Sequence, residues 1–372
     1  MLLAVMSAFA QFCLASMVGE GGGKHQWGCC LYVSVCFQNG ERDPGSSFTS
    51  FLGLRVKNGE VTCKKASLFL VTSDAPAEWI LSSVSIDSET SMLGRTLKGF
   101  RDQKEKDSAV TYLFYNDHPP DFGKSSVGHL KGYLLFDEKS GVWVIHSTPR
   151  FHEPDKYGFP FNARIYGHIA MCVTFATQSL NEICKHLLFC NPNIYDYKIS
   201  PALMRILDAD SQSLFSKKPN FITDPPFTRQ TTLESLAQVE FIAFAKDNQY
   251  EKDIYSDIIG PSLGEDLIVQ SWRRDSGRNL HSFCSDSIKV IDVVAINMTV
   301  KNGGKGIYLA SREDHSKWAI SKDNAKHLVC VADLNRMDSE AKRGGGAICL
   351  FSKPLRKAFK SIISDTEACP TG

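Results

Sequence analysis

The same short pattern, a histidine followed two positions later by a lysine, occurs once in each half of the chain. His129 and Lys131 form the first copy, and His315 and Lys317 form the second. In a β-strand, residues two positions apart point to the same face of the sheet. Each copy therefore places an imidazole beside a fixed positive charge. This pairing suits chemistry on a phosphate, because the lysine holds the anion while the histidine attacks phosphorus or donates a proton.

Each copy begins a segment that is typical of a β-hairpin. The first hairpin covers residues 128–146 and ends at His146, and the second covers residues 315–335 and ends at Asn335. A hairpin of this kind in each half is a much rarer coincidence than the three-residue pattern alone. The chain must therefore fold with antiparallel strands in both halves.

Each hairpin turn contains an aspartate, Asp137 in the first and Asp323 in the second. Aspartate is common in turns because its carboxylate accepts hydrogen bonds from nearby backbone N–H groups. We therefore assign both aspartates to the turns. His146, at the end of the first hairpin, is interpreted instead as a phosphate contact.

Strand-like and helix-like segments are mixed along the rest of the chain. Apolar, β-prone runs predict buried strands at residues 110–115 and 267–272. The spacing of apolar residues predicts helices over residues 178–189, 233–245 and 355–363. Strands and helices in both halves predict an α/β or α+β sandwich.

Two segments between the hairpins contain turn signals. Residues 211–229 include Lys217-Lys218-Pro219 and Pro225-Pro226, and they predict a loop between the two halves. Residues 260–264 match the G-x-S-x-G pattern of a hydrolase nucleophile, which requires a preceding strand. The segment before residue 260 looks like the end of a helix, so we interpret this pattern as a helix-terminating turn.

The composition is that of a globular protein with a sizeable core. The chain has 372 residues, of which 43% are hydrophobic and 22% are charged. Its net charge is +1, so no overall basic field marks it as a nucleic-acid binder. Any site for a polyanion must therefore be a local cleft.

The N-terminus predicts entry into the secretory pathway. Residues 2–17 are apolar and uncharged, too short for a membrane span, and followed by a glycine-rich segment, so we interpret residues 1–19 as a signal peptide. No other run is long enough to cross a bilayer, so we expect a mature protein without a membrane span. We expect secretion or delivery to the lysosome, with Asn297 of the Asn297-Met298-Thr299 sequon as a glycosylation site on a surface loop.

Twelve cysteines agree with an oxidising compartment. Removal of Cys13 with the signal peptide leaves an odd number, so at least one thiol is free or forms an intermolecular bond. The sequence contains neither C-x-x-C nor H-E-x-x-H, so it predicts no metal site.

The other histidines and two tryptophans have no comparable arrangement. We interpret the tryptophans Trp143 and Trp318 as core residues. Six further histidines are expected to be structural or surface residues; they are His118, His152, His168, His186, His281 and His327.

Further segments surround the two H-x-K pairs in a fixed order. They are Tyr115–Pro120, Gly128–Gly132, Trp143–Phe151, Phe244–Lys246, Glu313–Trp318, Asp333–Arg336 and Arg343–Gly346. In these segments the chain resembles the type II, or acid, deoxyribonuclease family. That family is itself similar to the phospholipase D superfamily, whose members carry paired H-K-D motifs.

The resemblance implies a phospholipase D-like fold. Two pseudo-symmetric, β-rich halves with flanking helices would form one cleft that contains both H-x-K pairs. In this chain the halves would span residues 28–210 and residues 230–372, and together they would make one domain.

The resemblance also implies an enzyme that cleaves DNA at acidic pH without a metal or other cofactor, leaving a 3′-phosphate and a 5′-hydroxyl. By analogy with the superfamily, His129 would attack phosphorus to form a phosphohistidine and His315 would donate a proton to the leaving oxygen, although the symmetry of the two motifs also allows the reverse order. Lys131 and Lys317 would stabilise the charge on the phosphoryl oxygens. One imidazole must be charged and the other neutral, so the optimum would lie near a histidine pKa of roughly 6.

The same resemblance assigns further residues. His146 and Asn335 would complete the phosphate contacts, and Cys284 would pair with Cys349. After His-Ser-Lys-Trp the family usually has a cysteine that pairs with the position of Cys330. This chain has Ala319 there, so Cys330 would be unpaired.

The first strand also departs from the family. In place of the usual aromatic-rich segment with a Tyr-Lys pair, this chain has Cys29-Cys30-Leu31-Tyr32-Val33-Ser34. Two alternatives therefore remain beside the acid nuclease. One is a catalytically weak secreted homologue that binds DNA or a host protein, and the other is a phosphodiesterase that acts on a lipid or a nucleotide.

Overall fold

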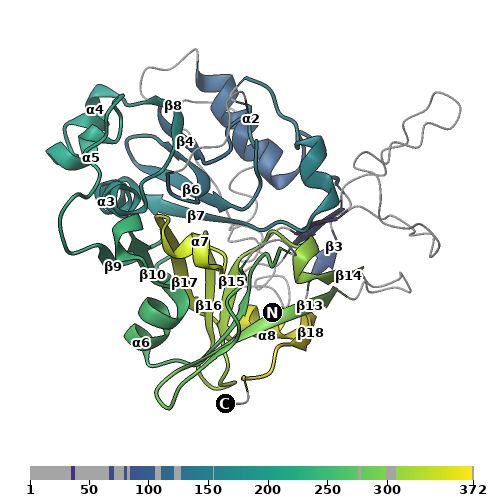
Figure 1. Cartoon of the computed structure of the whole chain (residues 1–372). Coiled ribbons are helices and arrows are strands. Elements are labelled where there is room, and N and C mark those ends of the chain that lie inside the picture. Colours follow the sequence, from purple (N-terminus) through teal and green to yellow (C-terminus); the bar gives the residue numbers. More distant parts are fainter. Residues whose placement is uncertain are drawn as a thin grey trace, which may run out of the picture.

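The computed structural model describes residues 35–37, 67–70, 79–81, 84–104, 110–120, 127–153, 155–274, 278–298 and 307–370. Within these residues the protein is a sheet-rich mixed α/β structure with few helices, as the sequence predicts (Figure 1). No helix in the described part of the chain is long and apolar enough to cross a membrane. The predicted signal peptide and the departing segment at residues 29–34 lie outside the described residues.

The first half contains a five-stranded antiparallel sheet. Its strand order is β7-β6-β5-β4-β8. The bounds are Thr111–Asn116 for β4, Lys131–Phe136 for β5, Ser140–His146 for β6, Ala170–Ala176 for β7 and Ile194–Lys198 for β8. Every residue of β4, β5 and β6 is buried, because helix α2 (Met92–Lys104) covers one face and the second half covers the other.

The second half contains a ten-stranded sheet. Its main strand order is β12-β13-β11-β15-β16-β17-β10-β9, and β14 and β18 both pair with β13. The bounds are Thr228–Glu234 for β9, Glu240–Lys246 for β10, Leu267–Gln270 for β11, Phe283–Cys284 for β12, Lys289–Met298 for β13, Ile307–Ala310 for β14, Trp318–Ser321 for β15, Leu328–Ala332 for β16, Gly345–Phe351 for β17 and Ile363–Thr366 for β18.

The remaining elements are short. A small sheet joins β1 (Val35–Phe37), β2 (Ser67–Leu70) and β3 (Ile80–Leu81). The α-helices are α3 (Leu180–Cys190), α4 (Pro201–Met204), α5 (Ala209–Ser213), α6 (Gly260–Leu263), α7 (Asp338–Ala341) and α8 (Lys353–Ile362). The 3₁₀ and π turns are η1 (Phe161–Ile165), η2 (Thr177–Ser179), η3 (Asn248–Tyr250), η4 (Tyr255–Ile259) and η5 (Ser311–Glu313).

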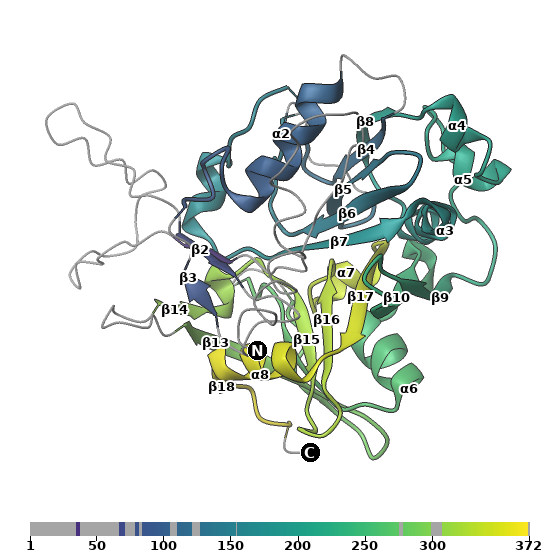
Figure 2. The same ribbon diagram turned by 180° about the vertical axis from the view of Figure 1, so that it is seen from behind.

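One continuous core joins the two halves. Helix α3 lies against β9 and β10, beside the edge strand β7 of the first sheet (Figure 2). The rings of Phe175 and Phe241, one from each sheet, pack with 6.1 Å between their centroids. Trp143 and Trp318 are each 2% exposed, so their prediction as core residues is confirmed.

Most predicted elements are present. The strands at residues 110–115 and 267–272 and the helices at 178–189 and 355–363 are confirmed as β4, β11, α3 and α8. The G-x-S-x-G segment ends helix α6 at Gly264, which has a φ of 61° that favours glycine. Its interpretation as a helix-terminating turn is therefore confirmed.

The predicted helix over residues 233–245 is wrong. These residues instead contain the end of β9, a turn and most of β10, and Glu234 pairs with Glu240. Phe241, Ala243 and Ala245 point to one buried face at a spacing of two, and pairing with β17 outweighs the local helical pattern. The predicted loop at 211–229 is also shortened, because α5 and β9 occupy its two ends.

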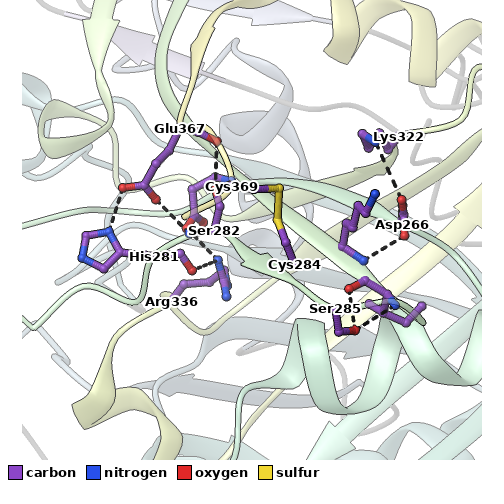
Figure 3. Close-up of a disulfide and its surroundings, with 12 residues drawn as sticks. Asp266, His281, Ser282, Cys284, Ser285, Lys322, Arg336, Glu367 and Cys369 are labelled. Atoms are coloured by element: carbon purple, nitrogen blue, oxygen red, sulfur yellow. Dashed lines mark hydrogen bonds and ion pairs between the residues drawn. A yellow bond between two sulfur atoms is a disulfide. The ribbon is translucent and has the colours of Figure 1, made fainter. Parts of the chain in front are cut away.

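The disulfides differ from the predicted pairing. Cys284 pairs with Cys369 near the C-terminus, as Figure 3 shows. Cys330 pairs with Cys349, because β16 and β17 are neighbours and place these residues opposite each other. The predicted Cys284–Cys349 bond is therefore wrong, and so is the expectation that Cys330 is unpaired.

Two free thiols and the predicted glycosylation site all lie in regular secondary structure. Cys184 and Cys190 are free and buried on helix α3. Asn297 is exposed, but it lies on strand β13 opposite Tyr308 rather than on a loop.

Candidate active site

A single cavity brings together both H-x-K pairs. It has a volume of about 320 Å³, and His129, Lys131, His315 and Lys317 all line it. This volume is at the lower end of the range for small-ligand sites. The four residues come from two sheets and from positions far apart in sequence, so the cavity is a product of tertiary structure.

The first pair is held by backbone of the second half. His129 lies two residues before β5, and its N–H donates to the carbonyl of Gly344 at 2.8 Å. The Arg343 guanidinium donates to the carbonyls of Val127 and Gly128. The loop between α7 and β17 therefore fixes the position of His129.

The second pair is held by backbone of the first half. The His315 N–H donates to the carbonyl of Gly167 at 2.8 Å, and the Gly167 N–H donates to the carbonyl of Glu313 at 2.9 Å. Asp314 is fully buried and accepts from the N–H and the hydroxyl of Ser316. The segment before β7 thus fixes His315, in the same way that the segment before β17 fixes His129.

Carboxylates surround His129. Its Nδ1 lies 2.9 Å from Oε2 of Glu340, and its Nε2 lies 3.9 Å from Oδ2 of Asp117. Burial lowers the pKa of His129 to about 4, although Glu340 and Asp117 act to raise it. Burial acts to raise the pKa of Glu340, but His129, Arg343 and Lys317 together outweigh it and hold that pKa at about 2. Glu340 is therefore ionised throughout the range in which His129 loses its proton.

Asp117 also binds the cation of the first pair. Its Oδ1 lies 2.5 Å from the Lys131 ammonium, and its Oδ2 lies 3.1 Å from the Arg343 guanidinium. Burial acts to raise the pKa of Asp117, but Lys131, His129 and Arg343 hold it well below its ordinary value. The Asp117 carboxylate is therefore a fixed negative charge that orients Lys131.

Aromatic rings surround His315. Its imidazole centroid lies 3.7 Å from the Trp272 ring and 4.2 Å from the Tyr166 ring, and these two rings also contact each other, so they form an aromatic corner that packs against His315. Its Nε2 is buried and lacks a hydrogen-bond partner in the described structure. Burial, then the neighbouring His168 and Lys317, hold the pKa of His315 well below its ordinary value.

The second lysine is held by a backbone carbonyl, whereas the first is held by a carboxylate. The Lys317 ammonium donates to the carbonyl of His315 at 2.8 Å. Burial and the like charge of Lys131 lower the pKa of Lys317 to about 7. Lys317 is therefore charged at acidic pH and loses its charge near neutrality.

Two histidines that the sequence placed outside the site line the cavity. They are His118 and His168. The His168 ring lies 5.2 Å from the His315 ring, and its nitrogens contact the Ser147 hydroxyl and the Ala163 carbonyl. Both ring nitrogens of His168 therefore already have hydrogen-bond partners, so we assign His168 a supporting role beside His315.

The two predicted phosphate contacts do not line the cavity. His146 is buried, and its Nδ1 accepts from the N–H of Thr148. The Asn335 amide accepts from the N–H of Trp272 and donates to Glu340. Asn335 therefore connects the residue stacked on His315 to the residue paired with His129.

The sequence also gave no role to Asp117, Glu340 or Arg343. Asp117 follows the buried strand β4 directly, a position where sites are common, so a signal was present. Glu340 lies on the four-residue helix α7, for which no pattern existed. Asp137 and Asp323 accept from backbone N–H groups of their own turns, so their assignment to turns is confirmed.

The described residues contain no group of three or more histidine, cysteine, aspartate or glutamate side chains that could hold a metal ion. The positive charge at the cavity comes instead from basic side chains.

Comparison with known proteins places the chain in a family. Residues 57–369 match the family model described as Deoxyribonuclease II. The chain is 35% identical over 298 residues to Deoxyribonuclease-2-alpha of Sus scrofa, which covers 78% of this chain and 79% of that protein. It is 31% identical over 314 residues to Deoxyribonuclease-2 of Caenorhabditis elegans, with 77% and 80% covered. It is also 31% identical over 266 residues to Plancitoxin-1 of Acanthaster planci, with 70% and 72% covered. The chain therefore belongs to the deoxyribonuclease II family.

Proposed function

We propose that the protein is an acid endodeoxyribonuclease that hydrolyses DNA to 3′-phosphate and 5′-hydroxyl ends, without a metal ion. The observation that carries this proposal is that both H-x-K pairs line one cavity while their two imidazoles have different partners. A two-step displacement needs such a difference, because one histidine must begin neutral and the other protonated.

His129 is the nucleophile in this mechanism. Glu340 faces its Nδ1, so the carboxylate holds the proton there and leaves the lone pair on Nε2. Nε2 attacks phosphorus, the P–N bond forms and the bond from phosphorus to O5′ breaks. His315 transfers its proton to O5′, which leaves as a hydroxyl.

Water completes the reaction. Neutral His315 accepts a proton from the water as its oxygen attacks phosphorus, and the P–N bond to His129 breaks. The product leaves with a 3′-phosphate, and His315 is protonated again. Lys131 and Lys317 stabilise the negative charge on the phosphoryl oxygens in both steps.

Acidic pH follows from the surroundings of three groups. His129 keeps a free lone pair down to a pH of about 4. His315 is hard to protonate because it is buried, so it requires acid, and the bound phosphate anion then favours its charged form. Lys317 keeps its charge only below about 7. Activity should therefore fall at neutral pH and again below about 4.

The two sheets also support a pseudo-symmetric, phospholipase D-like arrangement as part of the proposal. Each H-x-K pair stands at the start of a hairpin, β5-β6 or β15-β16, and each histidine N–H is bonded to backbone of the other half. We assign the halves to residues 28–210 and 230–372. The two described disulfides and the apolar N-terminus support a protein that is secreted or lysosomal.

The deciding experiment incubates the purified protein with supercoiled plasmid at a pH of about 5 in EDTA. We expect nicking by the wild type, product ends that a 3′-phosphatase must treat before a polymerase can extend them, and no nicking by His315→Ala. No nicking by the wild type, nicking only after addition of a metal ion, or undiminished nicking by His315→Ala would contradict the proposal.

A further inference from the structure

The charges that line the cavity are strongly unbalanced. Among the described residues, four basic side chains line it, Lys131, Lys317, Arg150 and Arg274, and one acidic side chain does, Asp117. The whole chain has a net charge of only +1. Asp117 is already occupied by Lys131, and the Lys317 ammonium donates to the His315 carbonyl. The two arginines therefore add positive charge that the H-x-K pairs do not explain.

Arg274 is held on a fixed platform beside His315. Its guanidinium lies over the Trp272 ring, 5.1 Å from the centroid, and that ring also packs against His315. The Trp272 indole donates to the Arg312 carbonyl, and its backbone N–H donates to the Asn335 amide. An arginine stacked on a fixed ring is pre-organised to bind an anion.

The Arg274 guanidinium also lacks a partner of its own. Its Nε is buried and has no hydrogen-bond acceptor within the described residues. A buried donor without an acceptor costs free energy, so an acceptor supplied by a ligand would be favoured. The ligand group that supplies this acceptor would therefore bind the guanidinium itself.

Arg150 stands in the cavity wall of the other half, in the loop that follows β6. Its φ is 60°, a left-handed conformation that is unfavourable for any residue with a Cβ. Its N–H donates to the His118 carbonyl at 2.7 Å, which holds the backbone in this conformation. The side chain is exposed, and in the part of the chain that the structure describes no carboxylate pairs with it. The strained backbone thus places a free guanidinium at the cavity.

One guanidinium group can bind two oxygens of the same phosphate at once, and a nucleic-acid strand presents one phosphate for every nucleotide. One arginine comes from each half of the protein, and the two histidines line the cavity with them. We infer that Arg150 and Arg274 bind the two phosphates that flank the scissile phosphate on the same strand. The inference rests on the proposed DNA cleavage and extends it, because it makes a strand with three consecutive phosphates the preferred substrate.

The test compares two short substrates that differ only in flanking phosphates. The dinucleotide TpT has the scissile phosphate alone, and pTpTp carries a phosphate on either side of it. We expect the wild type to prefer pTpTp in kcat/KM. Arg150→Gln and Arg274→Gln should each lose about tenfold on pTpTp, mainly through a higher KM, and each should lose distinctly less on TpT.

Salt dependence gives a second readout. Anisotropy of a labelled thymidine oligonucleotide, measured over a range of salt concentrations, should show a slope of log affinity against log salt that is smaller by about 0.7 in each variant. The matched control is Arg205→Gln, because Arg205 is exposed and does not line the cavity. Its kinetics and its slope should equal those of the wild type.

The outcomes separate this inference from the proposed function. Equal losses on TpT and pTpTp, or unchanged slopes in both variants, would overturn the flanking-phosphate assignment while cleavage itself stands. Wild-type protein that binds the oligonucleotide with arginine-dependent slopes but cleaves nothing would support the assignment and overturn the proposed function. Activity on TpT also shows that each variant is folded.

Discussion

His129 and His315 share one sequence motif and one cavity, but different groups surround their imidazoles. His129 faces the carboxylates of Glu340 and Asp117, whereas the rings of Tyr166 and Trp272 pack against His315. A carboxylate fixes the position of a proton on imidazole, and packed aromatic rings remove water from it. The difference shows how a repeated motif is given two separate roles by neighbours that lie far away in sequence.

The largest expected effect comes from removing each histidine in turn. On DNA, His129→Ala and His315→Ala should each lose more than about 10³-fold in kcat, because the nucleophile or the proton donor is absent. The two variants should differ on an ester with a good leaving group, such as thymidine 3′-(p-nitrophenyl phosphate). That leaving group needs no proton, so His315→Ala should recover the first turnover as a burst of p-nitrophenol, after which slow hydrolysis of the phosphohistidine limits the rate, and His129→Ala should recover none.

This pair of substrates tests the assignment of roles directly. Because a phosphohistidine is labile in acid, the reaction with radiolabelled substrate is quenched in alkaline detergent, which should trap a phosphoenzyme in His315→Ala and none in His129→Ala. Recovery by His129→Ala instead would reverse the two roles, and recovery by both or neither would show that the surroundings do not distinguish them.

The next effect concerns the carboxylate beside His129. Glu340→Gln removes a charge that raises the pKa of His129, so this pKa should fall below its present value of about 4. A lower pKa keeps the imidazole neutral in stronger acid, so the acid limb of the kcat/KM profile should move to lower pH. The rate at the optimum should fall about 10- to 100-fold, because the imidazole is no longer oriented.

Asp338→Asn is the matched control, because Asp338 lies exposed on the same helix α7. It should leave the profile unchanged. An acid limb that stays in place in Glu340→Gln would mean that the limb belongs to a group other than His129.

A smaller effect is expected at the second lysine. The pKa of Lys317 is about 7, because burial and Lys131 oppose its charge. Arginine keeps its charge at all working pH values, so Lys317→Arg should extend the profile toward neutral pH. The activity at a pH of about 7.5, divided by the activity at the optimum, should be about threefold higher in Lys317→Arg than in the wild type. Lys139→Arg, in the exposed turn of the first hairpin, should not change this ratio.

The sequence predicted the two H-x-K pairs but missed the neighbouring residues that distinguish the two histidines. The H-x-K pairs, β4, the two hairpins and the assignment of Asp137 and Asp323 to turns depend on local patterns, and local patterns are readable. Glu340 reaches His129 from the second half, and Tyr166 reaches His315 from the first half. These contacts depend on tertiary packing, so no spacing in the sequence could reveal them.

The wrong predictions have the same cause. Residues 233–245 have helical spacing, yet hairpin and sheet pairing place them in β9 and β10. Cys330 was expected to be unpaired because Ala319 stands where a cysteine is usual. Ala319 and Cys349 in fact lie opposite Cys330 on its two neighbouring strands, so the sulfur bonds on the other side.

The smallest effect tests how each histidine is held by the opposite half. The carbonyls that accept from the His315 and His129 N–H groups belong to Gly167 and Gly344. A Cβ added to Gly167 would lie 2.5 Å from Oδ1 of Asp314, and a Cβ added to Gly344 would meet the carbonyl of Cys190. A side chain can move but a buried helix carbonyl cannot. Gly344→Ala should therefore cost about 2 kcal/mol in the free energy of unfolding, and Gly167→Ala about 1 kcal/mol.

Activity should rank these two variants differently from stability. Gly167→Ala displaces Asp314, which precedes His315 and accepts hydrogen bonds from Ser316. This variant should therefore cleave DNA severalfold more slowly, while it releases p-nitrophenol from the ester at nearly the same rate as the wild type. Gly344→Ala shifts the carbonyl that holds His129, so it should slow cleavage of both substrates equally. Urea denaturation and paired assays measure the two rankings. If both variants slowed both substrates in the same proportion, the cross-bonded backbone would support the cavity as a whole rather than each histidine separately.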